Sequence, residues 1–290
     1  MTPEPSNNRP LGGSGHRGPP RLLVCPAGTV PYDRAWQWQK TLRERRAAGE
    51  LPDLLLLLDH PPSYTLGRST RPGHLAAAAA RGISIHRIER GGSITYHGPG
   101  QIVGYPIVDL RPRGRDIHRF IRELEEVLIR TLSELGVVAR RRRGLTGVWV
   151  EDRKIAAIGV HVRRWITMHG FALNVTSDLD PFRWIRPCGL DVDVTSVARL
   201  LGESAPGTDE VGAIVMRQFE AVFECRSEMV APELLGPMPD GPGDFVARTG
   251  AVQEGEGMQA GKLPLSRAAV TLENPAAESP VPTENDIYRS

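Results

Sequence analysis

The sequence contains little cysteine and no long apolar run. Three cysteines in 290 residues cannot all pair, so a disulfide-built scaffold is excluded and a reducing compartment is favoured. The longest apolar runs, 54–58 and 75–80, are far shorter than the ~20 residues that span a bilayer, which predicts no transmembrane helix. The first twenty residues hold five prolines and four glycines and lack the apolar segment of a signal peptide. We therefore expect a cytoplasmic protein that is not bound to a membrane.

Lysine is scarce as well, with three residues (Lys40, Lys154 and Lys262) against 33 arginines. A preference for arginine carries no function by itself. Arginine stays protonated at any accessible pH, however, whereas the lysine amine can lose its proton. Each remaining lysine is therefore a candidate for a task that arginine cannot perform.

Composition divides the chain into three parts. Residues 1–20 are rich in proline and glycine, and residues 231–290 contain eight prolines, seven glycines and a formal charge of −5. Neither part has enough apolar residues to offset the entropy lost on ordering, so we predict a disordered N-terminal extension and a disordered acidic tail. Residues 21–230 carry a formal charge of +6, and their length suits one folded domain.

The folded part mixes helical and strand periodicity. Apolar spacings of three and four predict helices over 33–48, 117–135 and 209–223, with Asp116 as the N-cap and Gly136 as the stop of the second. The predicted strands are 54–58, 83–88, 102–108, 148–151, 155–162 and 166–175, with turns at 152–153 and 163–165. This pattern predicts an α/β protein of the α+β type, in which helices surround a mixed or largely antiparallel sheet.

The segment from Arg90 to Gln101 reads Arg-Gly-Gly-Ser-Ile-Thr-Tyr-His-Gly-Pro-Gly-Gln. Four glycines in twelve positions let the backbone approach a ligand closely, while a few polar side chains orient it. The alternative is a glycine-rich hairpin with a hydrogen-bonded histidine. The segment is not G-x-G-x-x-G, and G-x-x-x-x-G-K-[ST] occurs nowhere in the chain, so no motif supports nucleotide binding.

Lys154 opens an apolar run that continues to Val162. An amine that can lose its proton at the start of a buried strand suits a general acid or base. The alternative is a hairpin lysine with its ammonium in water.

Cys188 lies between proline and glycine, in a loop ahead of a short helix for which Thr195 is the expected cap. Cys25 and Cys225 instead adjoin apolar residues, as buried thiols do. A loop thiol is accessible to substrate, and it becomes nucleophilic when a nearby cation, for which Lys154 is a candidate, lowers its pKa from ~8.5. The alternative is a loop cysteine without a function.

Other kinds of site have little support. The histidines lack H-x-x-x-H spacing and C-x-x-C does not occur, so no metal site is predicted. The run Arg140 to Arg143 is interpreted as a solvated turn rather than a phosphate or nucleic-acid site, because no aromatic residues are interleaved with it.

Six separated blocks, taken in order, resemble the lipoyl(octanoyl) transferase family. The blocks are His60–Arg68, Arg90–Gln101 with Tyr105-Pro106, Gly147–Val150, Lys154–Gly159, His169–Asn174, and Pro187–Gly189 with Thr195–Val197. They cover roughly residues 50–200, and their coincidence in order is highly specific. The resemblance implies a single domain of the biotin/lipoate protein ligase catalytic fold, a mixed sheet flanked by helices.

The resemblance also implies roles for individual residues. Cys188 is expected to be the acyl-thioester nucleophile and Lys154 the partner that lowers its pKa. Three strips are expected to bind the acyl substrate: Arg90, Gly91, Gly92, Ser93, Ile94, Thr95, Tyr96 and His97; Ala157, Ile158 and Gly159; Gly170, Phe171 and Ala172. Small residues in these strips would leave room for a linear acyl chain. Phe171 replaces the leucine that is commoner in the family, so it is expected to alter the depth of the acyl pocket.

The reaction implied is transfer of an octanoyl group from the phosphopantetheine thioester of octanoyl-acyl carrier protein. The acceptors would be lysines in the lipoyl domains of 2-oxoacid dehydrogenase complexes and in the glycine cleavage H protein. Neither ATP nor a metal is expected, because a thioester is already activated, and no nucleic acid is expected as a partner. Acidic protein partners would suit a domain of charge +6.

Two alternatives stay open at the level of sequence. One is an ATP-dependent lipoate- or biotin-protein ligase on the same fold. Against it, the glycine block reads His-Gly-Pro-Gly-Gln, where lipoate ligases have a His-Asp-x-Gly-Asn type of segment. The other is a non-catalytic module that binds an acyl chain or a carrier, which would not need Cys188 together with Lys154.

Overall fold

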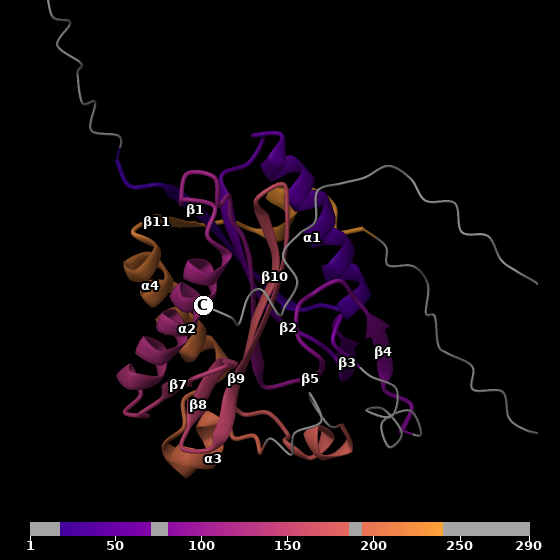
Figure 1. Ribbon diagram of the computed structural model, residues 1–290, viewed down its shortest axis with the longest axis vertical. Coiled ribbons are helices and arrows are strands. Elements are labelled where there is room, and N and C mark those ends of the chain that lie inside the picture. Colours follow the sequence, from indigo (N-terminus) through magenta and orange to yellow (C-terminus); the bar gives the residue numbers. More distant parts are fainter. Residues whose placement is uncertain (1–17, 71–80, 186–192, 240–290) are drawn as a thin grey trace, which may run out of the picture. The chain divides into compact units, whose positions relative to one another are not determined.

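The computed structural model describes residues 18–70, 81–185 and 193–239. Within them, eight strands form one mixed sheet in the order β11-β1-β2-β6-β10-β9-β8-β7 (Figure 1). The strands are β1 (Arg21–Thr29), β2 (Asp53–Asp59), β6 (Gln101–Ile107), β7 (Arg140–Arg142), β8 (Leu145–Val150), β9 (Arg153–Arg163), β10 (Ile166–Asn174) and β11 (Arg226–Met229). β1 runs parallel to both β2 and β11, and the remaining pairs are antiparallel. The predicted mixed sheet is therefore confirmed.

A second sheet has three strands in the order β4-β3-β5. They are β3 (Ser63–Leu66), β4 (Ser84–Arg87) and β5 (Ile94–His97). β5 comes from the glycine block itself and pairs antiparallel with β3, placing Thr95 opposite Thr65. The glycine block is therefore partly a strand, and its histidine ends that strand.

The helices are α1 (Tyr32–Ala47), α2 (Ile117–Glu134), α3 (Val197–Leu201) and α4 (Thr208–Phe223), with 3-10 turns η2 (Asp180–Trp184), η4 (Gly202–Ser204) and η5 (Pro232–Leu235). The three predicted long helices match α1, α2 and α4 within a residue at most ends. The Asp116 carboxylate accepts the Arg119 backbone N–H at 2.9 Å, and Gly136 follows α2 with a φ of 76°, as its cap and stop require.

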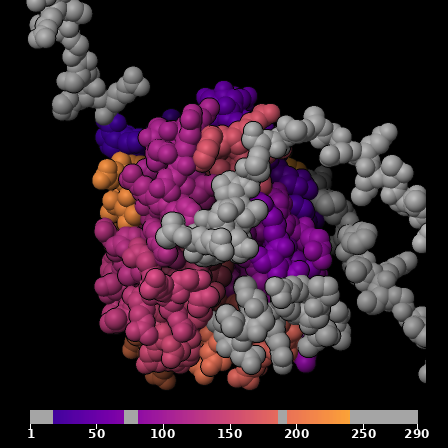
Figure 2. All heavy atoms as spheres, viewed as in Figure 1, coloured from indigo at the N-terminus to yellow at the C-terminus, as the bar shows by residue number. Residues whose placement is uncertain are grey.

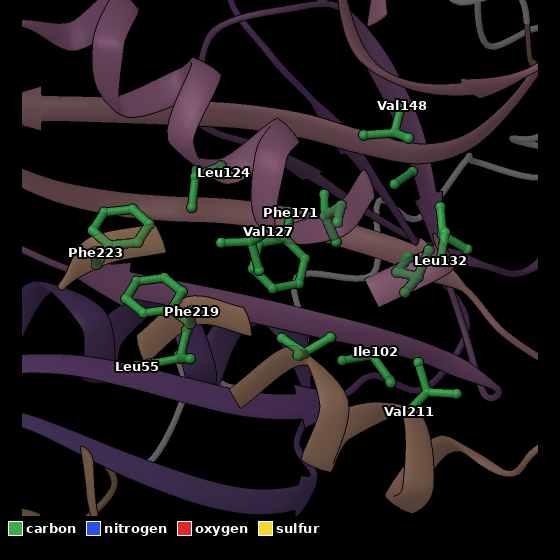
Figure 3. Close-up of a cluster of buried hydrophobic side chains, with 14 of the residues drawn as sticks. Leu55, Ile102, Leu124, Val127, Leu132, Val148, Phe171, Val211, Phe219 and Phe223 are labelled. Carbon is green, nitrogen blue, oxygen red and sulfur yellow. The ribbon is translucent and has the colours of Figure 1, made fainter. Parts of the chain in front are cut away.

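Alternating side chains of the large sheet build two cores. On one face, Val24, Leu55 and Phe171 pack against α2 and α4, and Figure 3 shows Phe171 pointing toward Leu124 and Val127 of α2. On the other face, the neighbouring strand residues, with Leu54 and Leu56 among them, pack against Trp38 and Leu42 of α1. Figure 1 shows α2 and α4 together on one side of the sheet and α1 on the other. The two-residue period of each strand thus sorts its apolar residues between the two cores.

Several strands and one turn differ from prediction. Strands β1, β3, β5, β7 and β11 are not predicted, and β7 consists of three arginines, which have no apolar alternation. The turn between β8 and β9 is formed by Glu151 and Asp152, one residue earlier than predicted, because Glu151 takes a φ of 52°. The second turn, at Arg164 and Trp165, lies within the predicted range.

The predicted C-terminal boundary of the folded domain at residue 230 is wrong. Pro232–Leu235 forms η5, and the Leu235 side chain is buried against the α1 core. Arg45 of α1 donates to the Leu235 carbonyl at 2.5 Å, and Arg34 donates to the Pro239 carbonyl at 3.3 Å. Composition missed this segment because a single buried leucine and two arginine contacts order it. The rest of the two segments predicted to be disordered, residues 1–17 and 240–290, lies outside the described residues.

No helix in the described ranges combines the length and the apolar character needed to cross a membrane.

Candidate active site

Lys154 stands near the start of β9, directly across from Trp149 of β8. Its side chain is half-buried, and its Nζ lies 4.8 Å from the centroid of the Trp149 ring. Gly147 borders the lysine stem: a Cβ at this position would lie 3.4 Å from Lys154 Cε and 2.7 Å from the Ala156 carbonyl oxygen. Gly147 also has a φ of 120°, which side chains rarely allow. The backbone angle and the Ala156 carbonyl therefore require a glycine at this position, and the lysine stem packs beside it.

The backbone of Lys154 is bonded to the segment that follows the predicted nucleophile. Its N–H donates to the Asp193 carbonyl at 2.8 Å, and its carbonyl accepts the Thr195 N–H at 3.0 Å. Cys188 itself lies outside the described residues, five positions before Asp193. The first described residues after Cys188 in the sequence are therefore bonded to the backbone of Lys154.

Thr195 does not cap the following helix. Ser196 is the N-cap of α3, and its Oγ accepts the Arg199 N–H at 3.2 Å. The predicted cap is wrong by one residue because the Thr195 backbone is engaged by β9 instead.

A buried polar network connects this segment to the glycine block. Gln101 Nε2 donates to the Tyr96 carbonyl at 3.2 Å and to Asn174 Oδ1 at 3.0 Å. Asn174 Nδ2 donates in turn to the Thr195 carbonyl at 3.0 Å. Gln101, Asn174 and Thr195 are all buried, so the bonds are shielded from water. Sequence reasoning missed the roles of Gln101 and Asn174, although a polar residue ending an apolar strand is a usable signal.

Two of the predicted substrate strips pair residue for residue. Gly170, Phe171 and Ala172 of β10 lie opposite Gly159, Ile158 and Ala157 of β9.

The third strip lies against β9 as well. The Gly91 N–H donates to the Val160 carbonyl at 3.0 Å, and a Cβ on Gly159 would lie 3.0 Å from both Arg90 Cδ and the Gly91 carbonyl oxygen. The Arg90 side chain is buried and donates to the Thr65 carbonyl at 2.7 Å and to Thr65 Oγ1 at 2.8 Å. The structure thus brings parts of all three strips together; that they bind an acyl chain stays a prediction.

The glycines of these strips have a packing role that differs from the one expected. A Cβ on Gly170 would lie 2.1 Å from the Gly104 carbonyl oxygen, so protein atoms already occupy that space. The Phe171 ring fills the α2-facing core, where a Cβ on Gly104 would lie 2.1 Å from its Cζ. The placement of Phe171 gives no support to the expectation that its ring alters the depth of an acyl pocket.

His97 lies in a buried cluster of rings with Tyr32, His60 and Tyr105. His60 Nδ1 donates to the Val30 carbonyl at 2.6 Å, and the Tyr105 hydroxyl donates to His60 Nε2 at 2.7 Å. His97 Nε2 lies 3.3 Å from Thr65 Oγ1, while its Nδ1 has no hydrogen-bond partner among the described residues. Burial lowers the pKa of His60 to about 4 and lowers the pKa of His97 well below 6.5. Both rings are therefore neutral at neutral pH.

This burial predicts acid sensitivity. The pKa of His60 falls from 6.5 in the unfolded chain to about 4 in the folded protein, so between these values the unfolded chain binds the extra proton. The free energy of unfolding is expected to stay constant above about pH 7 and to fall by about 3 kcal/mol for His60 alone as the pH drops to 4. Denaturant titrations at a series of pH values measure this slope. The His60→Gln variant should show a shallower slope than the wild type, whereas His118→Gln, at an exposed position on α2, should leave it unchanged; equal slopes in all three would contradict the assignment.

The arginine run is an edge strand rather than a solvated turn. Arg141 forms ion pairs with Glu125 at 3.1 Å and with Glu126 at 2.7 Å, both on α2. The Arg142 guanidinium lies 4.8 Å from the Trp149 ring centroid, on the ring that Lys154 also contacts. Within the described ranges, no group of three His, Cys, Asp or Glu side chains is arranged to hold a metal ion.

Comparison with known proteins gives consistent relatives. Residues 31–220 match the lipoyl protein ligase A/B catalytic domain. The chain is 48% identical over 216 residues to an octanoyltransferase of Gloeobacter violaceus, covering 73% of this chain and 95% of the relative. It is 49% identical over 186 residues to an octanoyltransferase of Geobacter metallireducens, covering 64% of this chain and 86% of the relative.

Solved structures show the same fold at lower identity. A lipoate-protein ligase A bound with ATP superposes with a TM-score of 0.58 at 18% identity, covering 75% of this chain and 92% of that one. A bipartite lipoate protein ligase from Thermoplasma acidophilum gives a TM-score of 0.55 at 19% identity, with coverages of 75% and 90%.

Proposed function

The chain belongs to the family of lipoyl protein ligase A/B catalytic domains, and from that premise we propose that it moves an octanoyl group from acyl carrier protein to a lipoyl-domain lysine through a thioester on Cys188. Its octanoyltransferase relatives, at 46–51% identity, make it an acyltransferase that acts in protein lipoylation. The carrier donor, the thioester intermediate and the roles of Cys188 and Lys154 are what the proposal adds.

The observation that carries the proposal is the attachment of the Lys154 backbone to Asp193 and Thr195. It joins the strand of the candidate acid–base residue to described residues that lie five and seven positions after Cys188 in the sequence. The other two cysteines are unsuitable nucleophiles, because burial raises the pKa of Cys25 to about 12 and that of Cys225 to about 11.

In the first half-reaction, the Cys188 thiolate attacks the thioester carbonyl of the octanoyl carrier. A new carbon–sulfur bond forms to Cys188, and the bond to the phosphopantetheine sulfur breaks. The Lys154 ammonium gives its proton to that departing thiolate, so the carrier leaves as a thiol and Lys154 becomes a neutral amine.

In the second half-reaction, the neutral amine of the acceptor lysine attacks the acyl-Cys188 carbonyl. An amide bond forms, the bond to Cys188 breaks, and the proton released by the acceptor nitrogen passes to Lys154. The enzyme is thereby restored to its thiolate and ammonium forms. Each step exchanges one acyl bond for another, so the reaction needs no ATP, metal or other cofactor.

The comparisons do not favour the ATP-dependent ligase alternative. The octanoyltransferases are more than twice as similar to this chain in sequence as the lipoate ligases that share its fold. A non-catalytic module is likewise not favoured by relatives that are named as enzymes. We place the reaction in the cytoplasm, because a free thiolate requires a reducing compartment.

Intact-mass spectrometry tests the acyl-enzyme. After incubation with octanoyl-acyl carrier protein and no acceptor, the wild type is expected to gain the mass of one octanoyl group, and hydroxylamine at neutral pH should remove it. The Cys225→Ala variant should gain the same mass, whereas Cys188→Ala should gain none. An adduct that persists in Cys188→Ala would overturn the proposal.

A further inference from the structure

Two cations contact a single buried indole ring beside the proposed acid–base residue. Trp149 is only 1% exposed and belongs to β8, which lies between β9 and β7 in the sheet. Lys154 Nζ reaches the ring from β9 and Arg142 Cζ from β7, each at 4.8 Å from the ring centroid. The two positive charges are therefore no more than about 10 Å apart, twice the centroid distance.

The surroundings restrict the lysine on its other sides. Gly147 borders the stem at Cε and Cδ, and two hydrogen bonds on one edge tie the Lys154 backbone to Asp193 and Thr195. The Trp149 ring forms a further wall, and a ring face attracts an ammonium. These contacts restrict the Lys154 side chain, which has four rotatable bonds. Proton transfer to the departing carrier thiolate requires such positioning.

Arg142 adds a charge that stays positive at every pH. Among the described residues it forms an ion pair with Asp152 at 3.5 Å; that carboxylate is 86% exposed and the Arg142 side chain is 37% exposed, so water screens both charges. Within the described part of the chain, the other charged side chains with contacts at this corner are Arg140, Glu151, Arg153, and Glu125, which accepts the Gly147 N–H. Asp193 is bonded to Lys154 through its backbone carbonyl. Glu151 is paired with Arg153, Glu125 with Arg122 and Arg141, and the Arg140 guanidinium donates to the Glu151 carbonyl.

A second cation near a lysine favours release of the lysine's proton. An ordinary lysine has a pKa near ~10.4 and a thiol near ~8.5, so protonation of a departing thiolate by an unperturbed lysine is unfavourable by about two pH units. A like charge about 10 Å away lowers the pKa of an ammonium by about 0.3 pH unit at the dielectric of water and by about one unit at an effective dielectric of 20. Because the Arg142 guanidinium is partly exposed, we expect about half a unit here.

We propose that Trp149 and Arg142 are positioning residues for Lys154: the indole ring fixes the place of its ammonium, and the guanidinium on the far strand promotes transfer of its proton. The inference rests on the proposed function, because it assigns Lys154 the acid–base role. It also assigns to Arg142 of β7 a positioning role that is separate from the ion pairs between Arg141 and α2. The β7–β8 hairpin lies on the face shown in Figure 2, where magenta and rose segments form the surface at the left.

The test compares Arg142→Gln with Arg143→Gln. Arg143 is exposed on the same hairpin, so its replacement removes the same charge and leaves the ring stack intact. Single-turnover octanoyl transfer is followed from pH 6 to pH 10 in each variant. Arg142→Gln should shift the pH limb that reports Lys154 upward by about half a unit and lower kcat about threefold, with KM for the carrier unchanged within about twofold. Arg143→Gln should match the wild type, and Arg142→Lys should restore most of the rate because it keeps a cation.

A second arm addresses the ring. Trp149→Phe keeps an aromatic face and should retain most activity, whereas Trp149→Leu should lower kcat about tenfold and slow alkylation of Cys188 by iodoacetamide in the absence of substrate. Thermal unfolding checks that both variants are folded. If Trp149→Leu does not fold, Trp149→His takes its place in the comparison with Trp149→Phe, and octanoyl transfer should be slower in Trp149→His.

Identical pH profiles for Arg142→Gln and Arg143→Gln would overturn the proposal. So would a raised KM with unchanged kcat in Arg142→Gln, which would make Arg142 a docking contact for the carrier. Failure of the proposed function is a separate result: the wild type itself would then form no octanoyl adduct at Cys188.

Discussion

Replacing Lys154 by arginine is expected to lower the rate of octanoyl transfer by about a hundredfold to ten-thousandfold, although the charge is kept. A guanidinium does not give up its proton at any accessible pH, so it can neither protonate the carrier thiolate nor accept a proton from the acceptor lysine. The longer, planar group would also have to fit between the Trp149 ring and Gly147, where the lysine stem already lies close to both. Single-turnover kinetics with octanoyl-acyl carrier protein and a lipoyl domain measure the effect.

The matched control is Lys40→Arg. Lys40 lies on α1 with its ammonium 3.6 Å from the centroid of the Trp36 ring, so the chain offers a second lysine stacked on a tryptophan, on a helix rather than on β9. That variant should transfer at close to the wild-type rate. Near-normal turnover in Lys154→Arg would mean that Lys154 acts only as a positive charge, and the acid–base role would have to be abandoned.

Replacing Glu125 by leucine is expected to lower the free energy of unfolding by about 1–3 kcal/mol. The Glu125 side chain is completely buried on α2, where it accepts the Gly147 N–H at 3.1 Å. It also pairs with Arg122 at 2.7 Å and Arg141 at 3.1 Å. Leucine would leave the Gly147 N–H buried without an acceptor and remove the carboxylate that both arginines contact. Because Gly147 borders Lys154, activity should fall along with stability.

Glu126 supplies the control on the next position of the same helix. It pairs with Arg130 at 2.8 Å and Arg141 at 2.7 Å, but it is partly exposed, and hydrogen bonds from Arg130 and Arg141 lower the pKa of its carboxyl. Glu126→Gln should cost less than about 1 kcal/mol, as solvent-exposed pairs do. Guanidinium chloride titrations of both variants give the comparison, and equal losses would show that burial of Glu125 is not what makes it important.

The long helices could be predicted because their signals are local. The start of α2 is encoded by Asp116 and its end by Gly136, and both signals act within a few residues of the chain. Strands in the two cores, such as β2 and β6, were predicted from their apolar residues alone. Strand β7 was not, because an edge strand of three arginines gains its pairing from β8 and its ion pairs from α2 rather than from any pattern of its own.

The same division applies to the candidate site. The family and its reaction could be recognised from residue types and their order along the chain, which also point to Lys154 and Cys188 as candidates. The surroundings of Lys154 depend on the tertiary structure: Trp149 opposite it, Arg142 beyond the ring, and Asp193 and Thr195 along its backbone.

The glycines show the reason most directly. In the sequence, Gly170 was interpreted as space for an acyl chain. In the structure, the space that a Cβ at position 170 would occupy is filled by the carbonyl of Gly104. Gly104 lies on the neighbouring strand, 66 positions earlier in the chain. Residue type and local period are properties of a segment, whereas strand order brings together residues that are far apart in sequence. The order β6-β10-β9-β8-β7 therefore determined which groups meet around Lys154.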